Sequence, residues 1–577
     1  MHRIRRVVAT IAAMADLARR LAVARGDEPA DLVVSGGRVL SVFTREWLEC
    51  DVAVCDGWIA GLGSYEGRER IDATGRYVVP GLVDGHVHLE SSRLLASEFA
   101  RLVLPFGTTC VVADPHEIAN VLGTDGVHWL LDATDGMPLD VRFTAPSCVP
   151  ASRFESPRRA LTEGDLEGLL RRRRVVGLAE MMNFPGVISG DPAELAKLAL
   201  AGAERADGHA PGVRGAALQA YAAAGIGSDH ESTTIEEGRE RLRAGMWLLV
   251  REATGARNLQ ELIPLARELG PHRMAFCTDD RDPQHIAADG HVNALVRDAV
   301  AAGVPPADAL VMATINPATW HGLTGLGAVA PGYRADLLVL PDLERFVPDV
   351  VLTAGRRPAE IGAAAVPEWV RHTVRVAPIT LGDLKIPWDG DGAARVIGVI
   401  PGQIVTEALT ETPTVAKGAV VADPERDLAK IAVVERHLGT GRIGLGLVRG
   451  LGLRAGAIAS TVAHDAHNIV CVGMDDGDMA RAVQRLAELG GGMVAVHDRG
   501  IRAELPLPVA GLLSDAPLER VLEQTAGVSA AARELGTSVE EPFHAIGFLS
   551  LSVIPELKIT DRGLVDVGRF ELVPLRA

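Results

Sequence analysis

The strongest constraint on the fold is a repeated alternation of short apolar runs and helix-like segments between residues 81 and 325. Eight runs have the character of strands: residues 81–88, 108–114, 140–147, 175–180, 206–211, 225–230, 246–252 and 274–280. Between them lie segments such as LLASEFARLVLPFG and NLQELIPLARELG, whose apolar residues have helical spacing. Eight strand–helix units within about 245 residues predict an α/β fold, a (β/α)8 barrel of the TIM type.

Strand-like sequence flanks this region on both sides. Residues 31–79 and residues 327–375 each contain short apolar runs separated by turn residues. We therefore predict a small β domain split into these two halves, with the barrel of residues 80–326 inserted between them. Residues 376–577 are predicted to form a C-terminal α+β domain, with helices at DLAKIAVVERHLG and DMARAVQRLAELG and strands at ARVIGVIPG and GGMVAVHDRG.

The N-terminal residues 1–30 are predicted to form an amphipathic packing helix. The segment MHRIRRVVATIAAMAD also resembles a weak signal peptide, because basic residues precede a short apolar stretch. The helix is favoured because one face collects Ile4, Val8, Ile11, Ala15, Ala18 and Ala22. The 6 cysteines form no CxxC motif and lie mostly in apolar runs, which indicates buried reduced thiols and a cytoplasmic location.

Composition excludes several classes of function. The 577 residues carry 58 basic and 75 acidic side chains, a net charge of −17, whereas nucleic-acid binding needs a basic surface. No run of 18 apolar residues predicts a membrane span. The chain also has no dinucleotide fingerprint, no Walker A motif and no GxSxG motif.

The predicted strands end in side chains that bind metals. These residues are His86, His88, Glu180, His209, His230 and Asp279. The carboxyl ends of all barrel strands meet at one mouth, and the HxH spacing directs both imidazoles to the same side of a strand. Four imidazoles and two carboxylates exceed the needs of one tetrahedral ion, so we predict two ions with Glu180 as the bridge. A mixed nitrogen and oxygen site suits Mn, Fe or Zn better than Ca.

Several longer motifs then resemble a known family. VVPGLVDGHVHLESS resembles the opening metal motif of the amidohydrolase superfamily. LPFGTTCVVADPHEIANVLG, GLAEMMNFPGV, FCTDDRDP, ATINPATWHGLTGLGAVAPGYRADLLVL, VIPGQIVTE and STVAHDAHNIVCVG resemble the bacterial adenine deaminases of that superfamily. The resemblance runs from about residue 30 to the end. HDAHN replaces the expected HDSHN, and the first 25 residues match nothing in the family.

This resemblance implies a purine-salvage enzyme that hydrolyses adenine to hypoxanthine and ammonia. It implies two divalent ions, with Mn²⁺ expected ahead of Fe²⁺ or Zn²⁺, held by the six strand-end residues named above. Adenine is the expected small-molecule substrate. The predicted assembly is a homodimer or higher homo-oligomer, without nucleic acid or membrane partners.

The chemistry of adenine assigns further roles. Asp279 is predicted to take the proton from the attacking water and to pass it to the departing amine. Ring N1 needs a proton donor, for which Glu252, Glu90 and Glu117 are the candidates. Asp114, His116 and Glu117 follow the second strand and are expected to contact the purine or to order water beside the metal ligands. Glu90 is also a candidate for binding the substrate. A last cluster, His464, Asp465 and His467, is expected to support the metal site across an interface or to bind an extra metal.

Two alternative functions stay open at this stage. The same metals and Asp279 would equally serve a hydrolase of cyclic amides, of N-acyl groups or of another 6-substituted purine. A metal-loaded, non-catalytic purine-binding protein is the other alternative, which the complete set of ligands disfavours.

Overall fold

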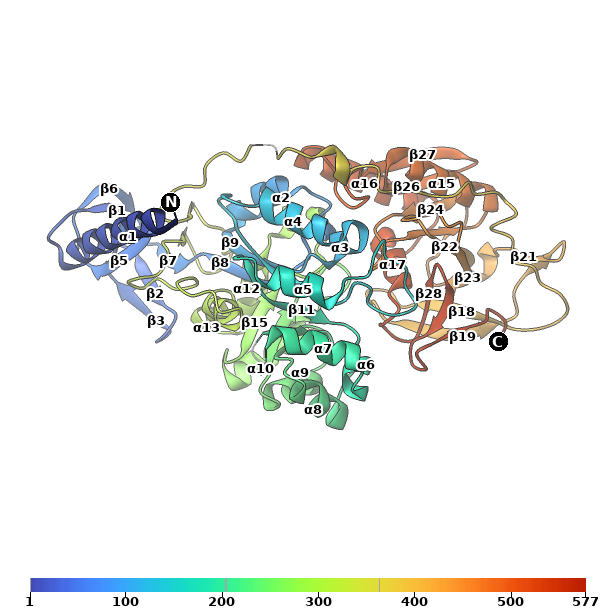
Figure 1. Ribbon diagram of the computed structural model, residues 1–577, viewed down its shortest axis with the longest axis horizontal. Coiled ribbons are helices and arrows are strands. Elements are labelled where there is room, and N and C mark those ends of the chain that lie inside the picture. The colour runs from blue at the N-terminus through green and yellow to red at the C-terminus, as the bar shows by residue number, and fades with distance from the viewer. Residues whose placement is uncertain (1, 203–204, 363) are drawn as a thin grey trace.

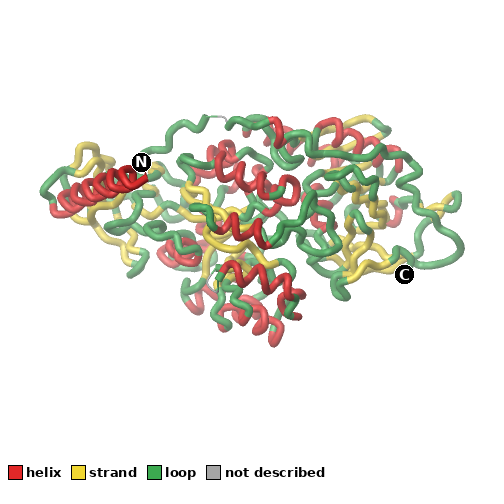
Figure 2. Tube along the Cα trace, in the orientation of Figure 1, coloured by secondary structure: helices red, strands yellow, loops and turns green. Residues whose placement is uncertain are grey.

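The computed structural model describes residues 2–202, 205–362 and 364–577, with backbone only for residues 2–13. The molecule is elongated, with a small β region at one end, a barrel in the middle and the C-terminal region at the other end (Figure 1). Figure 2 shows strands in all three parts and helices surrounding the central group of strands. The central position of the barrel allows both flanking regions to pack against it.

All eight predicted barrel strands are present. They are β8 (Leu82–Val87), β9 (Thr108–Ala113), β10 (Asp140–Ala145), β11 (Val175–Met181), β12 (Ala206–Gly208), β13 (Ser228–Asp229), β14 (Trp247–Arg251) and β15 (Met274–Cys277). Parallel pairing joins them into a five-stranded sheet, β12-β11-β10-β9-β8, and a three-stranded sheet, β13-β14-β15. Parallel bridges between Ala206 and Ile226 and between Val87 and Asp279 link the two sheets at both seams. The predicted barrel class is thus confirmed.

Helices follow the strands and cover the outside of the barrel. The main ones are α2 (Ala96–Val103), α3 (His116–Leu122), α4 (Thr124–Ala133), α5 (Glu163–Leu170), α7 (Pro192–Ala201), α8 (Gly215–Ala223), α9 (Ile235–Arg243), α10 (Leu259–Leu269) and α12 (Val292–Ala301). Inside the barrel, Leu249, Ala275 and Cys277 form a small apolar cluster below the mouth. Residues two positions further along these strands therefore point into the mouth.

The small β region contains strands from both flanks of the barrel. β7 (Tyr77–Pro80) pairs with β16 (Leu337–Leu340), so that residue 338 lies opposite residue 79. β16 belongs to the sheet β17-β16-β7-β2-β3, and a second sheet has the order β5-β4-β1-β6. The other strands of these sheets are β1 (Ala30–Ser35), β2 (Arg38–Ser41), β3 (Glu46–Glu49), β4 (Asp51–Cys55), β5 (Trp58–Gly63), β6 (Gly67–Asp72) and β17 (Val350–Leu352). This pairing is what a β domain split by an inserted barrel requires; the domain boundaries at residues 30, 79, 326 and 375 stay predictions.

Helix α1 (His2–Arg25) lies against the small β region, but not on the predicted face. Ala15 and Ala18 are exposed, while Arg19 and Arg20 are half-buried. Arg19 forms ion pairs with Asp31 and Asp56, and Val23 is fully buried in an apolar cluster with residues of the small β region. These contacts, rather than an alanine stripe, hold this part of the helix. The side chains of Ile4, Val8 and Ile11 lie outside the described residues.

The C-terminal region is built on an eight-stranded sheet with the order β19-β18-β23-β22-β25-β24-β26-β27. Its strands are β18 (Ala394–Val399), β19 (Thr406–Glu411), β22 (Leu428–Val434), β23 (Ile443–Arg449), β24 (Ala457–Ser460), β25 (Ile469–Gly473), β26 (Gly492–His497) and β27 (Gly500–Pro506). Helices α15 (Asp476–Leu489), α16 (Leu518–Glu534) and α17 (Pro542–Gly547) pack with it, and β28 (Leu557–Thr560) begins a small final sheet.

One predicted helix of this region is a strand. DLAKIAVVERHLG contains β22, which pairs with a strand on each side and is buried along its whole length. A strand covered on both faces lacks the apolar–polar alternation that identifies strands in a sequence, so its run of apolar residues resembles a buried helix. The other predicted helix is α15.

The remaining global predictions concern cysteines and membranes. All six cysteines are free thiols, and five are buried, as expected. Among the described residues, the helices are too short or too polar to cross a bilayer.

Candidate metal centre and active site

The six predicted metal ligands meet at one mouth of the barrel. His86 and His88 come from the end of β8, Glu180 from β11, and His209, His230 and Asp279 follow β12, β13 and β15. Each is at least 96% buried. The chain turns into a left-handed conformation at Asp279, where φ is 52°, and the Asp279 amide donates to the His86 carbonyl at 3.0 Å. This turn fixes the carboxylate beside the HxH pair.

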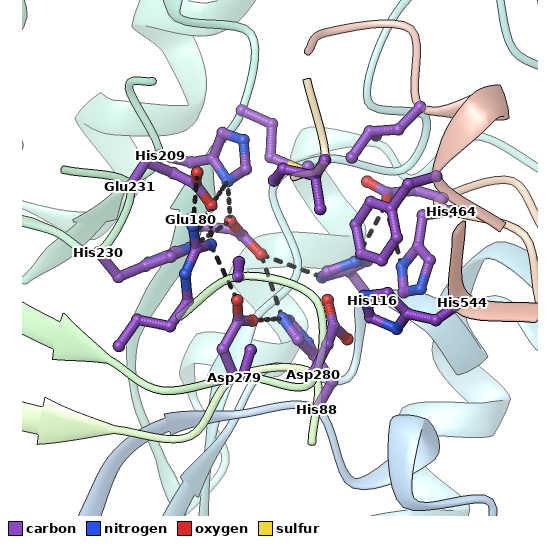
Figure 3. A pocket seen from close by; sticks show the side chains of 18 residues that line it. His88, His116, Glu180, His209, His230, Glu231, Asp279, Asp280, His464 and His544 are labelled. Carbon is purple, nitrogen blue, oxygen red and sulfur yellow. Dashed lines mark hydrogen bonds and ion pairs between the residues drawn. The ribbon is translucent and has the colours of Figure 1, made fainter. Parts of the chain in front are cut away.

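Glu180 lies between His88 on one side and His209 and His230 on the other (Figure 3), and His86 Nε2 lies 3.2 Å from His88 Nε2. Its Oε1 is 3.8 Å from His86 Nε2 and 3.5 Å from His88 Nε2. Its Oε2 is 2.7 Å from His209 Nδ1 and 3.4 Å from His230 Nε2. The two oxygens of one carboxylate therefore face different pairs of imidazoles, which is the arrangement of a bridging ligand.

The donor atoms fit divalent cations. Three compact groups form: His86, His88 and Glu180; His86, His230 and Asp279; Glu180, His209 and His230. His86 Nε2 and His88 Nε2 are 3.2 Å apart, so two ring nitrogens are directed at the same point. On the other side, His209 Nδ1 and His230 Nε2 both face Glu180 Oε2. Imidazole nitrogens and carboxylate oxygens together are the donor set that divalent transition metals prefer.

The charges of the carboxylates favour cations as well. Burial would raise the pKa of Glu180, but His209 and His230 hold it well below its ordinary value. Burial likewise acts against ionisation of Asp279, but hydrogen bonds from His86 and His88 and the charge of Arg251 lower its pKa well below the usual range. Both carboxylates are therefore anionic at neutral pH.

Arg251 is a residue of this site that the sequence interpretation missed. Its Nη1 donates to Asp279 Oδ2 at 3.0 Å and its Nη2 to Glu231 Oε2 at 3.0 Å. Glu231 Oε1 in turn lies 3.6 Å from His209 Nδ1. The guanidinium is 2% exposed. It therefore neutralises and orients two buried carboxylates at the mouth.

The structure places Glu252 away from the cavity, which corrects its prediction as a proton donor. Its carboxylate accepts from the Leu259 amide at 3.2 Å. Because side chains alternate along a strand, residue 251 shares the inward face with Leu249, and Glu252 points the other way. Counting two residues forward from the inward-facing Leu249 would have identified Arg251 in the sequence.

His116 reaches the cavity from the start of α3. Its Nδ1 is 3.6 Å from Glu180 Oε1 and 3.3 Å from Asp114 Oδ2. Its Nε2 faces Asp465 Oδ1 of the C-terminal region at 3.6 Å. Asp114 itself does not line the cavity; its Oδ1 accepts from the His116 amide at 3.2 Å. Asp114 therefore positions His116.

Glu90 and Glu117 are buried behind this wall. Glu90 Oε1 accepts from the Ile118 amide at 3.1 Å, which ties it to α3. Glu117 Oε1 accepts from Ser91 Oγ at 3.1 Å and lies 3.3 Å from His464 Nδ1. Burial and the charge of Asp280 raise the pKa of Glu117 well above its ordinary value. Neither carboxylate lines the cavity, so neither touches a ligand there directly.

The C-terminal region closes the mouth of the barrel. It contributes Ile404, His464, Asp465, His544, Phe548 and Leu551 to the cavity wall. The rings of His464 and Phe548 stack with centroids 4.1 Å apart and planes 15° apart. His467 does not line the cavity; its Nδ1 accepts from the Ala463 amide at 3.1 Å. Two of the three predicted residues of the HDAHN cluster thus reach the site.

Four further wall residues carried little signal in the sequence. Glu231 follows His230 in a loop, where strand alternation no longer applies, and Asp280 follows Asp279 in the same way. His544 and Phe548 lie in α17 and the turn after it, which reach the barrel only through packing between the two regions. Only the adjacency of Glu231 and Asp280 to predicted ligands could have indicated them.

Lys558 on β28 holds two cavity-lining residues in place. Its Nζ donates to the carbonyl oxygens of Ile404 at 2.7 Å and Phe548 at 3.0 Å. The side chain is fully buried, and burial lowers the pKa of the ammonium group to about 7. Its charge state is therefore coupled to the stability of this wall.

We expect Lys558→Met to change how stability depends on pH. The unfolded chain holds this proton up to a pKa of about 10.4, whereas the folded chain releases it at about 7. Between these values the unfolded state binds more protons, so the wild-type free energy of unfolding rises with pH, and below pH 7 this gain is absent. Unfolding in urea at several pH values measures this effect. The midpoint of the wild type should rise relative to that of the variant between about pH 7 and 10.

Lys385→Met is the matched control, because Lys385 is exposed. Its difference from the wild type should not vary with pH. A constant difference for Lys558→Met as well would show that Lys558 keeps an ordinary pKa in the folded protein.

Two family models match the chain. The amidohydrolase family model covers residues 77–358, and the adenine deaminase C-terminal domain model covers residues 403–571. The first match spans the barrel with the six predicted metal ligands, and the second spans the segments that close the mouth.

Similar proteins match over nearly the whole length. An adenine deaminase of Desulfatibacillum aliphaticivorans is 47% identical over 563 residues, covering 96% of this chain and 99% of the relative. Adenine deaminase 2 of Carboxydothermus hydrogenoformans is 47% identical over 560 residues, covering 96% and 98%. Among solved structures, a β-aspartyl dipeptidase of Fervidobacterium islandicum AW-1 aligns with a TM-score of 0.44 and 16% identity over 59% of this chain and all of that one.

Proposed function

Because the chain belongs to the adenine deaminase family of the amidohydrolases, we propose that it hydrolyses adenine to hypoxanthine and ammonia. One observation supports this most strongly: relatives called adenine deaminase match both the barrel with its ligand cluster and the region that closes it. A hydrolase of cyclic amides or N-acyl groups would need the barrel cluster alone. We also propose that the protein acts in purine salvage, that it is located in the cytoplasm and that it forms a homo-oligomer.

The proposed cofactor is a pair of divalent ions, with Mn²⁺ preferred. His86, His88, Glu180, His209, His230 and Asp279 would hold them, with Glu180 between the two sites. This assignment is supported by the division of the Glu180 oxygens between two pairs of histidines. Bound divalent ions supply Lewis acidity that makes a water molecule easy to deprotonate near neutral pH.

Asp279 is the proposed proton carrier. Arg251 occupies its Oδ2, whereas Oδ1 lies 3.0 Å from His88 Nε2, on the side of the ligand cluster. That oxygen is positioned to accept a proton from the attacking water and to return it to the departing amine. As the amine becomes ammonia, the carboxylate is restored for the next cycle.

The proposed donor to ring N1 is Glu117, acting through His464. Among the three carboxylates predicted for this role, Glu252 and Glu90 accept hydrogen bonds from backbone amides. Glu117 has a raised pKa and lies 3.3 Å from the ring nitrogen of His464, which lines the cavity. A carboxylic acid kept protonated at neutral pH can supply a proton through an intervening imidazole.

The proposed purine wall is Phe548, whose ring is held in place by stacking against His464. An aromatic ring offers a flat apolar surface beside charged groups, and a purine base has a matching face. Met182 and Leu551 extend this apolar part of the cavity. The barrel would thus provide the reacting groups and the C-terminal region the surface against which the base lies.

The test is release of ammonia from adenine by the purified full-length protein. We expect turnover when Mn²⁺ is supplied, loss of activity to the background of protein-free samples after chelation, and recovery on adding Mn²⁺ again. The manganese counted in the same samples should approach two ions per chain in the active form, as a bridging carboxylate requires.

Hydantoin and an N-acetylated amino sugar serve as comparison substrates. Turnover of either one without turnover of adenine would refute the substrate while leaving the metal centre in place. Bound metal without turnover of any substrate would support the non-catalytic alternative.

A further inference from the structure

A second group of metal-binding side chains lies beside the barrel cluster. His116 begins α3, Cys148 follows β10, and Asp465 lies in the loop between β24 and β25 of the C-terminal region. They are 2%, 3% and 1% exposed. One ligand atom from each lies within 4.8 Å of the other two. Three distant parts of the chain thus bring a nitrogen, a sulfur and an oxygen donor together.

His116 and Asp465 are not joined by a hydrogen bond. His116 Nε2 and Asp465 Oδ1 are 3.6 Å apart, longer than an ordinary hydrogen bond. Asp465 Oδ2 is buried without a hydrogen-bond partner among the described residues. By contrast, two ligands at about 2.1 Å from a tetrahedral ion lie about 3.4 Å apart. The spacing therefore fits a shared cation better than a direct contact.

Asp114 gives His116 the orientation of a metal ligand. Its Oδ2 lies 3.3 Å from His116 Nδ1, on the side of the ring opposite Asp465. The contact is an ion-pair distance rather than a hydrogen bond, but a carboxylate beside one ring nitrogen favours the proton on that nitrogen and leaves the other nitrogen free to bind a metal. His116 Nε2 is thereby available to an ion between Cys148 and Asp465.

We propose that His116, Cys148 and Asp465 bind a further divalent cation of the zinc class, separate from the ions of the barrel cluster. A thiolate, an imidazole and a carboxylate suit Zn²⁺ better than Mn²⁺, whereas the barrel cluster contains no sulfur ligand. The ligand charges of one thiolate and one carboxylate balance a dication. This ion would join the barrel to the C-terminal region beside the cavity that His116 and Asp465 line.

The proposal is tested with Co²⁺ as the probe in the metal-free full-length protein. We expect a thiolate-to-cobalt absorption band in the near ultraviolet, with an intensity of one sulfur ligand per chain. Cys148→Ala should abolish the band and reduce the bound cobalt by one ion per chain. Asp465→Asn should weaken or abolish it without removing the thiol, and covers the case in which Cys148→Ala does not fold.

Cys110→Ala is the matched control, because Cys110 is an equally buried thiol on neighbouring strand β9. It should keep the full band. The proposal is overturned if the wild type shows no thiolate band at saturating cobalt, or if the band persists in Cys148→Ala. The absorption band is measured without adenine. If the band is present but the protein does not deaminate adenine, the metal site stands and only the proposed function is refuted.

Discussion

Asp279→Asn is expected to lower kcat for adenine by about 10³-fold or more, the usual contribution of a proton-transferring side chain. Asparagine keeps the shape of the side chain and an oxygen that can still face the cluster, but it cannot take up a proton. Glu180 and the four histidines remain, so the metal content should stay largely unchanged. Steady-state ammonia release and metal analysis on the same preparation measure both quantities.

Asp289→Asn is a suitable control, because Asp289 is exposed at the end of α11 (Pro283–Asp289) and should leave kcat unchanged. If the Asp279→Asn variant kept more than about a tenth of the wild-type kcat, the proposal that Asp279 carries the proton would be wrong. Joint loss of activity and of most of the metal would instead assign it mainly to metal binding.

The ligand cluster could be predicted from the sequence because a barrel converts chain order into spatial order. His86, Glu180 and Asp279 lie far apart in the chain, yet each ends a parallel strand, and all such ends meet at one mouth. Strand periodicity also predicted that His86 and His88 would point the same way. No knowledge of tertiary packing was needed for these residues.

The rest of the site depends on packing that periodicity does not encode. Asp465 and Phe548 reach the cavity only because the C-terminal region packs on the barrel. β22 resembled a helix because neighbours cover both of its faces. Arg251 is a different case, because strand alternation alone would have placed its side chain in the mouth. Glu252 was predicted instead because the reaction needs an acid and Glu252 has a carboxyl group.

Arg251→Met is expected to destabilise the barrel by about 3–5 kcal/mol, because it leaves two buried carboxylates without their counterion. Arg251 pairs with Asp279 at 3.0 Å and with Glu231, and all three side chains are at most 6% exposed. The loss should appear as a lower thermal unfolding midpoint of the metal-loaded protein. Activity should also fall, because Asp279 loses the contact that fixes its Oδ2.

Two comparison variants separate this from a general effect of removing an arginine. Arg239 pairs with Glu268 across 2.7 Å on the surface, where the side chains are 26% and 55% exposed, so solvent screens the charges. Arg239→Met should therefore cost at most about 1 kcal/mol. Adding Glu231→Gln to Arg251→Met should recover part of the lost stability, since one uncompensated charge is removed. Equal midpoints for Arg251→Met and Arg239→Met would show that bound metal ions alone neutralise the carboxylates and that Arg251 contributes no stability of its own.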